Sequence, residues 1–381
     1  MAYFLWAVGG AWLLFGAAAL RNTLATPRLP SLVELAPPPM PPRVSVIVAA
    51  RDEAARIEQT VLRLLAQREV DLEVVVVDDR STDETPAILA RLACEHPALR
   101  VLRVDALPPG WLGKCHACAL GARDARGDWL LFADGDSHLR DDLIARAVAT
   151  AERDGASHLT LWPALNCSGA LTQASVLAWG QCLAAYAPPA RINRDRGRRG
   201  IGVGAFNLVR AEAYRAIGGH EPLRMEVVDD VKLGLLLRRA GFRQRLYGGS
   251  EDLECEWAHS VFGVVRAVEK NWFAGMNYNL PLTAAVLAAM TALWLAGLLG
   301  PLLHPTAGWF ALAGAFSPIL PAVVQARSLG WPLRAALLAP LGFGTFIVAG
   351  AHSTLKTILQ GGIRWRDTFY PLAELRAGTV R

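Results

Sequence analysis

Apolar residues divide this chain into long uncharged runs near its two ends and shorter runs between them. In the middle, four short runs are continuously apolar rather than alternating, which is typical of strands buried on both faces. These predicted strands cover residues 44–50, 72–77, 99–104 and 129–133. Because segments with helical periodicity separate them, we expect an α/β domain with a mainly parallel, doubly wound sheet.

The segments between these strands predict three helices, at residues 53–67, from a cap at Thr82 and Asp83 to about Cys94, and at residues 116–125. The second half of the domain has a weaker pattern. There we expect strands at residues 158–162 and 202–209 and a helix at residues 228–240. No internal repeat is visible.

The N-terminal apolar run covers residues 3–20 and is about long enough to span a bilayer. A cleaved signal peptide is the alternative, but no Lys or Arg precedes the run and no cleavage site stands before Arg21. We therefore expect an uncleaved anchor. Arg21 and Arg28 follow it, and the positive-inside rule then places the next segment in the cytoplasm.

Three further apolar runs, at residues 280–303, 306–325 and 335–355, stand near the other end and predict membrane spans rather than buried core helices. An anchor plus three spans would put the C-terminus on the side opposite the α/β domain. The basic tail, however, is expected inside. One segment is therefore expected to be re-entrant or interfacial, and residues 306–325 are the weakest candidate.

The predicted order along the chain is an anchor at 1–21, a Pro-rich linker at 22–42, an α/β domain at 43–260, an interfacial amphipathic segment at 261–279, spans at 280–356 and a basic tail at 357–381. The interfacial prediction rests on aromatic residues, Trp272 and Phe273 among them, interleaved with Arg266 and Lys270.

The net charge is +5, and hydrophobic residues make up 53% of the chain. Basic residues gather at 191–199, which suits an anionic membrane surface or a nucleotide diphosphate. No nucleic-acid motif accompanies them, so no nucleic acid is expected as a partner. Cys115 and Cys118 form a Cys-x-x-Cys without a second pair at zinc spacing, so packing thiols are expected rather than a metal or redox site.

Acidic residues follow the predicted strands, where ligands bind in parallel α/β sheets. Asp52 and Asp79 follow the first two strands, and Asp134-Gly135-Asp136 follows the fourth. Alone, an Asp-Gly-Asp is more often a solvated turn. At the end of a buried strand, its carboxylates can hold a hard divalent cation, Mg²⁺ or Mn²⁺, that also accepts diphosphate oxygens.

Asp229 and Asp230 stand together at the start of a predicted helix. Acidic residues are favoured there by the helix dipole, which is the plain structural explanation. The alternative is a carboxylate that accepts a proton from a substrate hydroxyl.

Six motifs stand in order along the chain, namely Val46-Ile47-Val48-Ala49-Ala50-Arg51-Asp52-Glu53, Val77-Asp78-Asp79, Gly110-Trp111-Leu112-Gly113-Lys114, Asp134-Gly135-Asp136, Gly218-Gly219-His220 and Val228-Asp229-Asp230. Together they resemble the membrane-bound glycosyltransferases of family 2, which have a Rossmann-like GT-A fold. The resemblance covers residues 44 to about 278, and the tail Ile363-Arg364-Trp365-Arg366-Asp367 resembles a Trp-Arg-Gly motif of that family. Members that glycosylate lipids such as ceramides, hopanoids or carotenoids are the most similar.

The resemblance implies a role for each matching residue. Asp79 would bind uridine, and the turn with Ala50, Arg51 and Glu53 would surround the base. Lys114 would meet the nucleotide or its diphosphate, Asp134 would lie near the ribose, and Asp136 would ligate the metal. The general base would be Asp230, with Asp229 beside it. His220 and Trp272 are weaker candidates for the acceptor side.

One motif departs from the family. Many members carry Gln-x-x-Arg-Trp before the C-terminal spans, whereas this chain has Val268-Glu269-Lys270-Asn271-Trp272. Lys270 or Arg266 could bind the diphosphate instead. We therefore expect an inverting, multi-pass enzyme of the inner membrane that transfers one sugar from a nucleotide diphosphate donor to a lipid hydroxyl at the cytoplasmic face. The resemblance implies a UDP-linked donor. A membrane polysaccharide synthase and a catalytically silent scaffold are the alternatives.

Overall fold

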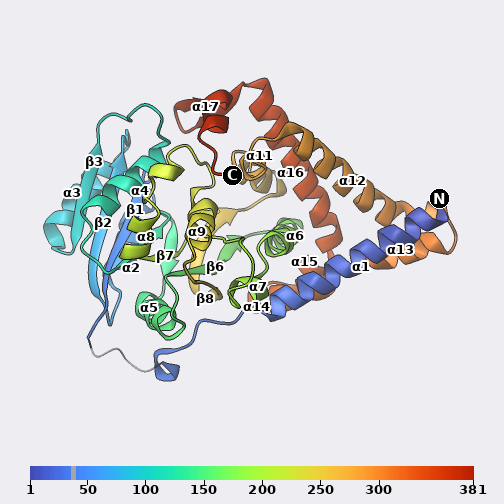
Figure 1. The fold of residues 1–381 in the computed structure, drawn as a ribbon, viewed down its shortest axis with the longest axis horizontal. Helices are drawn as coiled ribbons and strands as arrows, with labels where there is room; N and C mark the ends of the chain where they lie inside the picture. The colour runs from blue at the N-terminus through green and yellow to red at the C-terminus, as the bar shows by residue number, and fades with distance from the viewer. Residues whose placement is uncertain (36–39) are drawn as a thin grey trace. The chain divides into compact units, whose positions relative to one another are not determined.

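The computed structural model describes residues 1–35 and 40–381, so the Pro37-Pro38-Pro39 part of the predicted linker lies outside the described residues. By its internal packing the chain forms two compact units (Figure 1). The sheet unit contains Pro27–Leu165, Arg191–Glu256 and Ala377–Arg381. The helical unit contains Met1–Thr26, Asn166–Ala190 and Trp257–Arg376.

The sheet unit is built on an eight-stranded sheet with the order β3-β2-β1-β4-β7-β6-β8-β5. β1 pairs in parallel with β2 and β4, and β2 pairs in parallel with β3, as the continuous apolar strands predict. β7 runs antiparallel to both β4 and β6. The strands are β1 (Arg43–Ala50), β2 (Asp71–Asp79), β3 (Leu99–Val104), β4 (Trp129–Ala133), β5 (Ser137–Leu139), β6 (His158–Cys167), β7 (Asn207–Arg210) and β8 (Gln244–Ala258).

Helices cover both faces of the sheet, because alternate residues of each central strand point to opposite faces. From β1, Val46 and Val48 pack with Ile57 of α2 and Leu89 of α3. Ile47 faces the other side, where it packs with Leu233 of α9. The helices of this unit are α2 (Ile57–Leu65), α3 (Thr85–Glu95), α4 (Gly113–Arg123), α5 (Leu143–Arg153), α8 (Ala211–Ala216) and α9 (Asp229–Arg239), with short 3-10 turns at Leu32–Glu34 and Glu221–Leu223.

Several predicted boundaries were wrong where local contacts override the pattern. α2 begins four residues after the predicted start, because residues 51–56 form a turn with Asp52 at φ 52°. α4 begins at Gly113 rather than at residue 116. β7 keeps only the last part of the predicted strand at 202–209. The elements missed by the pattern include β5, α5, α8, β8 and the helix Ala170–Tyr186 (α6).

The helical unit contains three helices long and apolar enough to cross a membrane, namely Ala2–Leu24, Leu280–Leu303 and Ala307–Ser328. The third is interrupted near Pro318, so it forms two helices, α13 and α14. The elements of this unit are α1 (Ala2–Leu24), α6, α7 (Pro189–Ile192, whose last two residues are assigned to the sheet unit), α10 (Val261–Ala267), α11 (Asn271–Gly275), α12 (Leu280–Leu303), α13 (Ala307–Ala315), α14 (Ile319–Ser328), α15 (Leu333–Leu337), α16 (Ala339–Leu359), β9 (Gly362–Trp365), β10 (Thr368–Pro371) and α17 (Leu372–Ala377).

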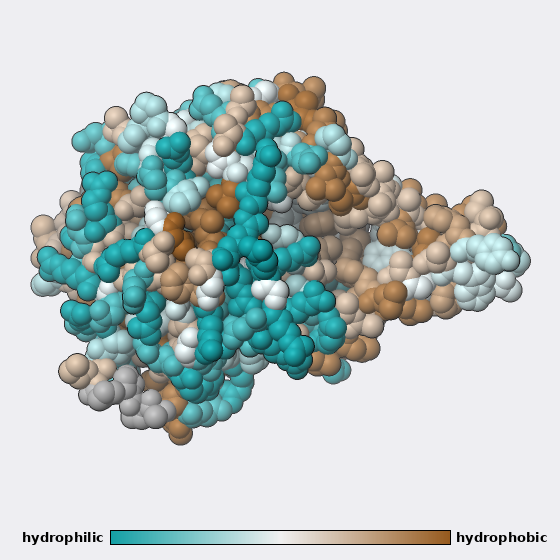
Figure 2. Space-filling view, viewed as in Figure 1, coloured by the Kyte–Doolittle hydropathy of each residue, from teal (hydrophilic) through white to brown (hydrophobic). Residues whose placement is uncertain are grey.

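Close helix contacts at glycines hold these apolar helices together. A Cβ added to Gly314 of α13 would lie 2.5 Å from the carbonyl oxygen of Gly9 in α1, and one added to Gly300 of α12 would lie 2.7 Å from that of Gly308. Small residues that let backbones approach are typical of helix packing in membranes. Large apolar side chains such as Leu14 and Leu302 remain exposed on the outside, and Figure 2 shows hydrophobic residues along these helices.

The predicted fourth span is a helix, α16, but it is not among the three apolar candidates. Its C-terminal half carries His352 and Lys356, which both pair with Glu269 at 2.8 and 2.7 Å. The predicted interfacial segment forms two short helices, α10 and α11. In α11, Trp272 and Phe273 are buried inside the helical unit, which corrects the expectation that both rings lie at the membrane surface.

Candidate active site

Two turns that follow β1 and β2 are joined by hydrogen bonds, which fixes the predicted base-binding turn. The backbone N–H of Asp52 donates to the Ser81 hydroxyl at 2.9 Å, and that of Thr82 donates to the Asp52 carboxylate at 2.8 Å. The N–H of Glu53 donates to the Thr85 hydroxyl at 2.9 Å. Ala50, Arg51 and Glu53 therefore lie on a backbone whose conformation the neighbouring turn determines.

Asp79 ends β2 and is buried, and arginines surround it. The guanidinium of Arg80 makes a two-pronged contact with its carboxylate, at 2.8 and 3.1 Å, and Arg51 lies 3.9 Å away. Gly113 at the start of α4 approaches so closely that an added Cβ would lie 2.1 Å from Asp79 Oδ2. The predicted nucleotide-binding carboxylate therefore lies between the two turns and the N-terminus of α4, and its contact with uridine stays a prediction.

The Asp-Gly-Asp segment leaves β4 as a loop with a fixed backbone. The Thr60 hydroxyl donates to the carbonyl of Gly135 at 2.7 Å. Burial is the main cause that raises the pKa of Asp136 to about 6, and repulsion from Asp134 and Glu53 adds to it. A carboxylate crowded by two others, with Arg56 only at 3.9 Å, is one that a divalent cation would stabilise.

Lys114 connects this loop with the start of α9. Its ammonium lies 2.7 Å from Asp134 Oδ1 and 3.9 Å from Asp229 Oδ1. Burial alone would lower the pKa of Lys114, but attraction to Asp134 and then Asp229 outweighs it, and the pKa rises well above its usual range. Lys114 therefore stays a cation at neutral pH, next to the carboxylates where an anionic leaving group would need one.

Asp230 is held by two backbone donors. The N–H of Gly204 donates to Oδ2 and the N–H of Val231 donates to Oδ1, both at 2.8 Å. Burial, with repulsion from Asp229 as the next cause, raises the pKa of Asp230 to about 6. A carboxylate with a fixed orientation and a raised pKa is suited to accept a proton near neutral pH.

Asp229 and His220 are buried, whereas Asp230 is partly exposed. His220 is buried, it is hydrogen-bonded through Nδ1 to the Tyr214 hydroxyl at 2.7 Å, and its Nε2 lies 3.9 Å from Asp229 Oδ2. Cys118 also lies here, and ligand atoms of Cys118, His220 and Asp229 all fall within 4.8 Å of one another. Burial raises the pKa of the Cys118 thiol, which favours a packing thiol as the sequence predicts.

The structure brings together most of the predicted site residues of the sheet unit. Lys114, Asp134, Asp229 and Asp230 form one cluster, and Asp136 adjoins it through Asp134. The acceptor-side role of His220 stays a prediction. Trp272 lies in the helical unit, where its ring packs against Phe346 at 5.6 Å between centroids.

Two residues in the site escaped the sequence prediction. Gly204 supplies the backbone donor to Asp230, and a Cβ there would lie 2.6 Å from Asp134 Oδ2. Asn207 donates to the backbone carbonyl of Asp230 at 3.4 Å. The available signal was the pair of glycines at 202 and 204 within a predicted strand, because glycine there often marks a close backbone approach.

Comparisons with known proteins agree with this geometry. The family described as "Glycosyl transferase family 2" matches residues 45–218. A 4,4'-diaponeurosporenoate glycosyltransferase of Staphylococcus aureus (strain USA300) is 24% identical over 269 residues, which cover 68% of each chain. The protein of the same name from strain bovine RF122 is 25% identical over the same length and coverage.

The fold has a counterpart among solved structures. A mannosyltransferase from Pyrobaculum calidifontis, solved in complex with GDP-Man and Mn²⁺, superposes with a TM-score of 0.53 at 22% identity, over 92% of this chain and 99% of that one. This likeness supports the GT-A-like arrangement of the sheet unit. Residues 45–218 match the family 2 glycosyltransferases, and together with the named relatives this match identifies the protein as a glycosyltransferase.

Proposed function

We propose that this protein transfers a sugar from a nucleotide diphosphate sugar to the hydroxyl of a membrane lipid, with inversion at the anomeric carbon. The observation that carries the proposal is the cluster of Asp230, Lys114 and Asp134 at the carboxyl edge of the parallel strands. It offers a proton acceptor with a raised pKa beside a permanent cation.

The chemical step follows from these two groups. Asp230 accepts the proton of the acceptor hydroxyl while that oxygen forms a bond to the anomeric carbon. The bond from this carbon to the diphosphate oxygen breaks, and its electron pair leaves with the nucleoside diphosphate. Lys114 stabilises the negative charge that develops on the leaving group. One displacement from the face opposite the leaving group inverts the configuration.

The donor set also fits a divalent cation. Asp136 offers a hard oxygen ligand on a loop held by Thr60, and burial together with the neighbouring carboxylates raises its pKa to about 6. A bound Mg²⁺ or Mn²⁺ would neutralise diphosphate charge there. The related mannosyltransferase was solved with GDP-Man, so a UDP-linked donor stays a prediction from the resemblance.

The acceptor class rests on the apolar helices and on the named relatives. Three helices are long and apolar enough to cross a membrane, and the similar S. aureus proteins are named for glycosylation of a carotenoid acid. A lipid acceptor keeps its reacting group near the headgroups while its tail remains in hydrocarbon. An enzyme anchored in the same bilayer can reach it there.

The C-terminal residues support a membrane topology. Ala377–Arg381 belong to the sheet unit, where Val380 packs near Leu233 and Leu237, and where its backbone contacts Lys232 and Glu226. Because both ends of the segment Trp257–Arg376 join the sheet unit, this segment must cross the membrane an even number of times. Crossings by α12 and by α13 with α14 meet this condition and keep the basic tail inside. In this topology α16 does not cross, and the enzyme faces the cytoplasm from the inner membrane.

The relatives' name suggests a second candidate for the acceptor group. A diaponeurosporenoate is a carboxylate, which needs no deprotonation at neutral pH. With such an acceptor, Asp230 would not act as a base and its charge would repel the acceptor. Loss of the Asp230 charge therefore distinguishes the two candidates, because it would slow transfer to a hydroxyl and not to a carboxylate.

The direct test uses the full chain in lipid nanodiscs with radiolabelled UDP- and GDP-linked sugars and a lipid extract. We expect the label to enter one organic-soluble lipid, and Asp136→Ala to abolish this transfer. Label that enters only a water-soluble polymer would favour a polysaccharide synthase. No transfer with any donor and acceptor, together with intact folding, would contradict the proposal.

A further inference from the structure

The loop at residues 191–199 carries five exposed arginines, namely Arg191, Arg194, Arg196, Arg198 and Arg199. Within residues 1–35 and 40–381, no ion pair or side-chain hydrogen bond involves Arg194, Arg196 or Arg198. Like charges at this density repel one another, and an unsupported segment of this kind would spread out in water. The loop nevertheless has a defined conformation, with three side-chain anchors beneath it.

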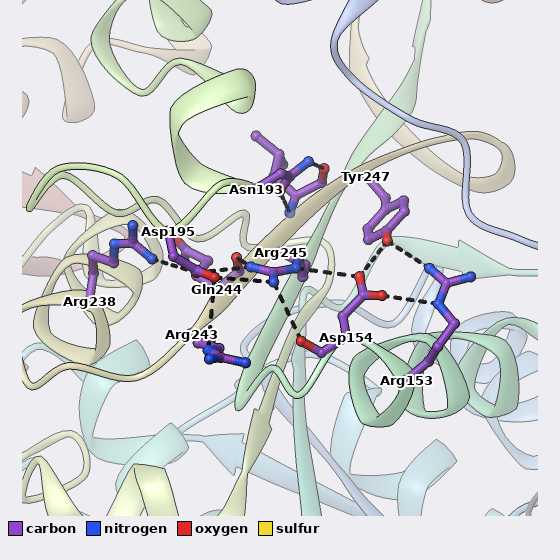
Figure 3. Close-up of polar contacts among 10 residues, drawn as sticks. Arg153, Asp154, Asn193, Asp195, Arg238, Arg243, Gln244, Arg245 and Tyr247 are labelled. Atoms are coloured by element: carbon purple, nitrogen blue, oxygen red, sulfur yellow. Dashed lines mark hydrogen bonds and ion pairs between the residues drawn. The ribbon is translucent and has the colours of Figure 1, made fainter.

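Asp195 supplies the first anchor (Figure 3). Arg238 Nη1 and Arg245 Nη1 lie 3.0 and 2.9 Å from its carboxylate, and Arg243 Nε lies 3.9 Å away. The Asn193 side chain forms the second, because it exchanges two hydrogen bonds with the backbone of Leu246 in β8, at 2.9 and 2.8 Å. The third runs from Arg238 Nε to the carbonyl of Gly197 at 3.2 Å.

These anchors hold the loop in place without neutralising it. Asp195 is the only acidic residue within 191–199, and its charge is already shared among the arginines beneath it. Asp154, the other carboxylate of this network, is paired with Arg153 and Arg245. The positive charge of the loop therefore remains available to an anion outside the protein.

Chain continuity limits how far the start of the loop can lie from the end of a candidate membrane span. Asn22, in the last turn of α1, donates to the carbonyl of Ala184 near the end of α6 at 3.0 Å. Arg191 follows Ala184 by seven residues, a reach of at most about 25 Å. Basic clusters that follow a membrane segment on the cytoplasmic side attract anionic headgroups.

We propose that the 191–199 loop is a binding surface for the headgroups of anionic phospholipids, through Arg194, Arg196 and Arg198. The inference rests on the proposed membrane location but not on the sugar-transfer reaction. Phosphate oxygens are suitable partners because a guanidinium donates to them in a two-pronged geometry. Such contacts would hold the sheet unit at the membrane surface, where a lipid acceptor is reached.

The test compares lipid retention by full-length variants. The chain is placed in nanodiscs of phosphatidylcholine with phosphatidylglycerol, and the lipids that stay bound are counted by native mass spectrometry. We expect the wild type to retain phosphatidylglycerol preferentially. The variant R194Q/R196Q/R198Q keeps Asn193 and Asp195. Its preference for phosphatidylglycerol over phosphatidylcholine should fall at least about fivefold, because one arginine at an anionic membrane surface already contributes about that factor.

A matched control removes the same charge elsewhere. R43Q/R68Q/R91Q changes three exposed arginines of the sheet unit that are each paired with a carboxylate, at 2.8, 3.0 and 2.7 Å. It should retain phosphatidylglycerol like the wild type, and inorganic phosphate should not displace the lipid. Equal retention by both triple variants would overturn the inference.

Two further outcomes distinguish this inference from a donor-binding role of the arginines and from the proposed sugar transfer. If R194Q/R196Q/R198Q weakens binding of the nucleotide sugar in calorimetry while lipid retention is unchanged, the arginines serve the donor and the inference is wrong. If the wild type retains phosphatidylglycerol through these arginines but transfers no sugar, the proposed function fails and the binding surface stands.

Discussion

Replacing Asp230 by Asn isolates the proposed proton acceptor with little change in shape. Asn keeps one oxygen that can accept from the Gly204 or the Val231 backbone N–H, which both reach Asp230 at 2.8 Å. It cannot accept a proton from a hydroxyl. The backbone position of α9 should persist, because Asn207 contacts the carbonyl of residue 230 and not its side chain.

The size of the expected rate loss follows from the pKa of Asp230 and from its role as a general base. Loss of a general base typically lowers the rate by about 10²- to 10⁴-fold. In the wild type, a pKa of about 6 leaves Asp230 mostly ionised at pH 7.5. The rate should therefore halve near pH 6 and fall about tenfold for each further unit. With an Asp of ordinary pKa, the rate would stay constant until the pH falls to about 4.

The assay measures label transferred from the nucleotide sugar to the lipid in nanodiscs between pH 5 and 8.5, and calorimetry measures donor affinity. Asp229→Asn serves as the matched control, because its carboxylate faces Lys114 and His220 at 3.9 Å rather than the Gly204 N–H. We expect Asp230→Asn to bind the donor with normal affinity and to transfer the sugar much more slowly. Its residual rate should no longer fall below pH 6. An active Asp230→Asn beside an inactive Asp229→Asn would refute the assignment, and two active variants would favour a carboxylate acceptor.

Three other predictions follow from the same geometry. Burial and like charges raise the pKa of Asp136 to about 6, so the metal-free fold loses stability as the pH rises from about 4 to about 6, and the loss is complete above pH 6. Asp136→Asn should therefore raise the melting temperature in EDTA at pH 7.5, corresponding to up to about 3 kcal/mol in free energy of unfolding, and most of this gain should be absent at pH 4. A gain of the same size at both pH values would contradict this prediction. Gly204→Ala should lower the rate of transfer about 10²-fold, because its Cβ would lie 2.6 Å from Asp134 Oδ2. The control Gly135→Ala, whose Cβ would lie 3.8 Å from its nearest neighbour, should lower the rate far less, and equal losses would refute the close approach. A reporter inserted between α12 and α13 should be periplasmic and one after α14 cytoplasmic, and the reverse labelling would exclude the proposed topology.

The parallel core was predictable because each of its strands is a short, continuously apolar run. β3 and β4 have the predicted bounds, and β1 and β2 differ by one or two residues at their ends. The helix starts were less predictable. The sequence predicts Asp52 at the ligand-binding edge of the sheet and Asp83 as a helix cap, but in the fold their side chains accept hydrogen bonds from the backbone N–H groups of Thr82 and Ala54 in the facing turn.

The position of Asp79, Asp134 and Asp136 at one edge of the sheet was predictable, because residues that follow parallel strands lie at the same edge. Their mutual arrangement was not. The pairing of Lys114 with Asp134 depends on where α4 begins, and the pattern placed that start three residues late. The contact of Gly204 with Asp230 joins residues 26 positions apart through a backbone N–H, which leaves no side-chain signal in the sequence.

The burial of Trp272 and Phe273 shows a different limit. Aromatic and basic residues alternate in this segment in the way that suits a membrane surface, and the same alternation suits a helix packed against a neighbour. The structure has the second arrangement, since the Phe273 N–H donates to the Ser353 hydroxyl of α16 at 3.1 Å and the Lys270 ammonium lies 4.0 Å from the Trp365 ring. Only the partner helix decides between the two.

The anomeric configuration of the product tests the central claim most directly. A single displacement assisted by Asp230 must invert the anomeric carbon, whether the donor carries a UDP or a GDP leaving group. In NMR of the lipid product made from an α-linked nucleotide sugar, the one-bond coupling between the anomeric carbon and its proton should therefore be that of a β-linked sugar. A product with the α configuration would contradict the account.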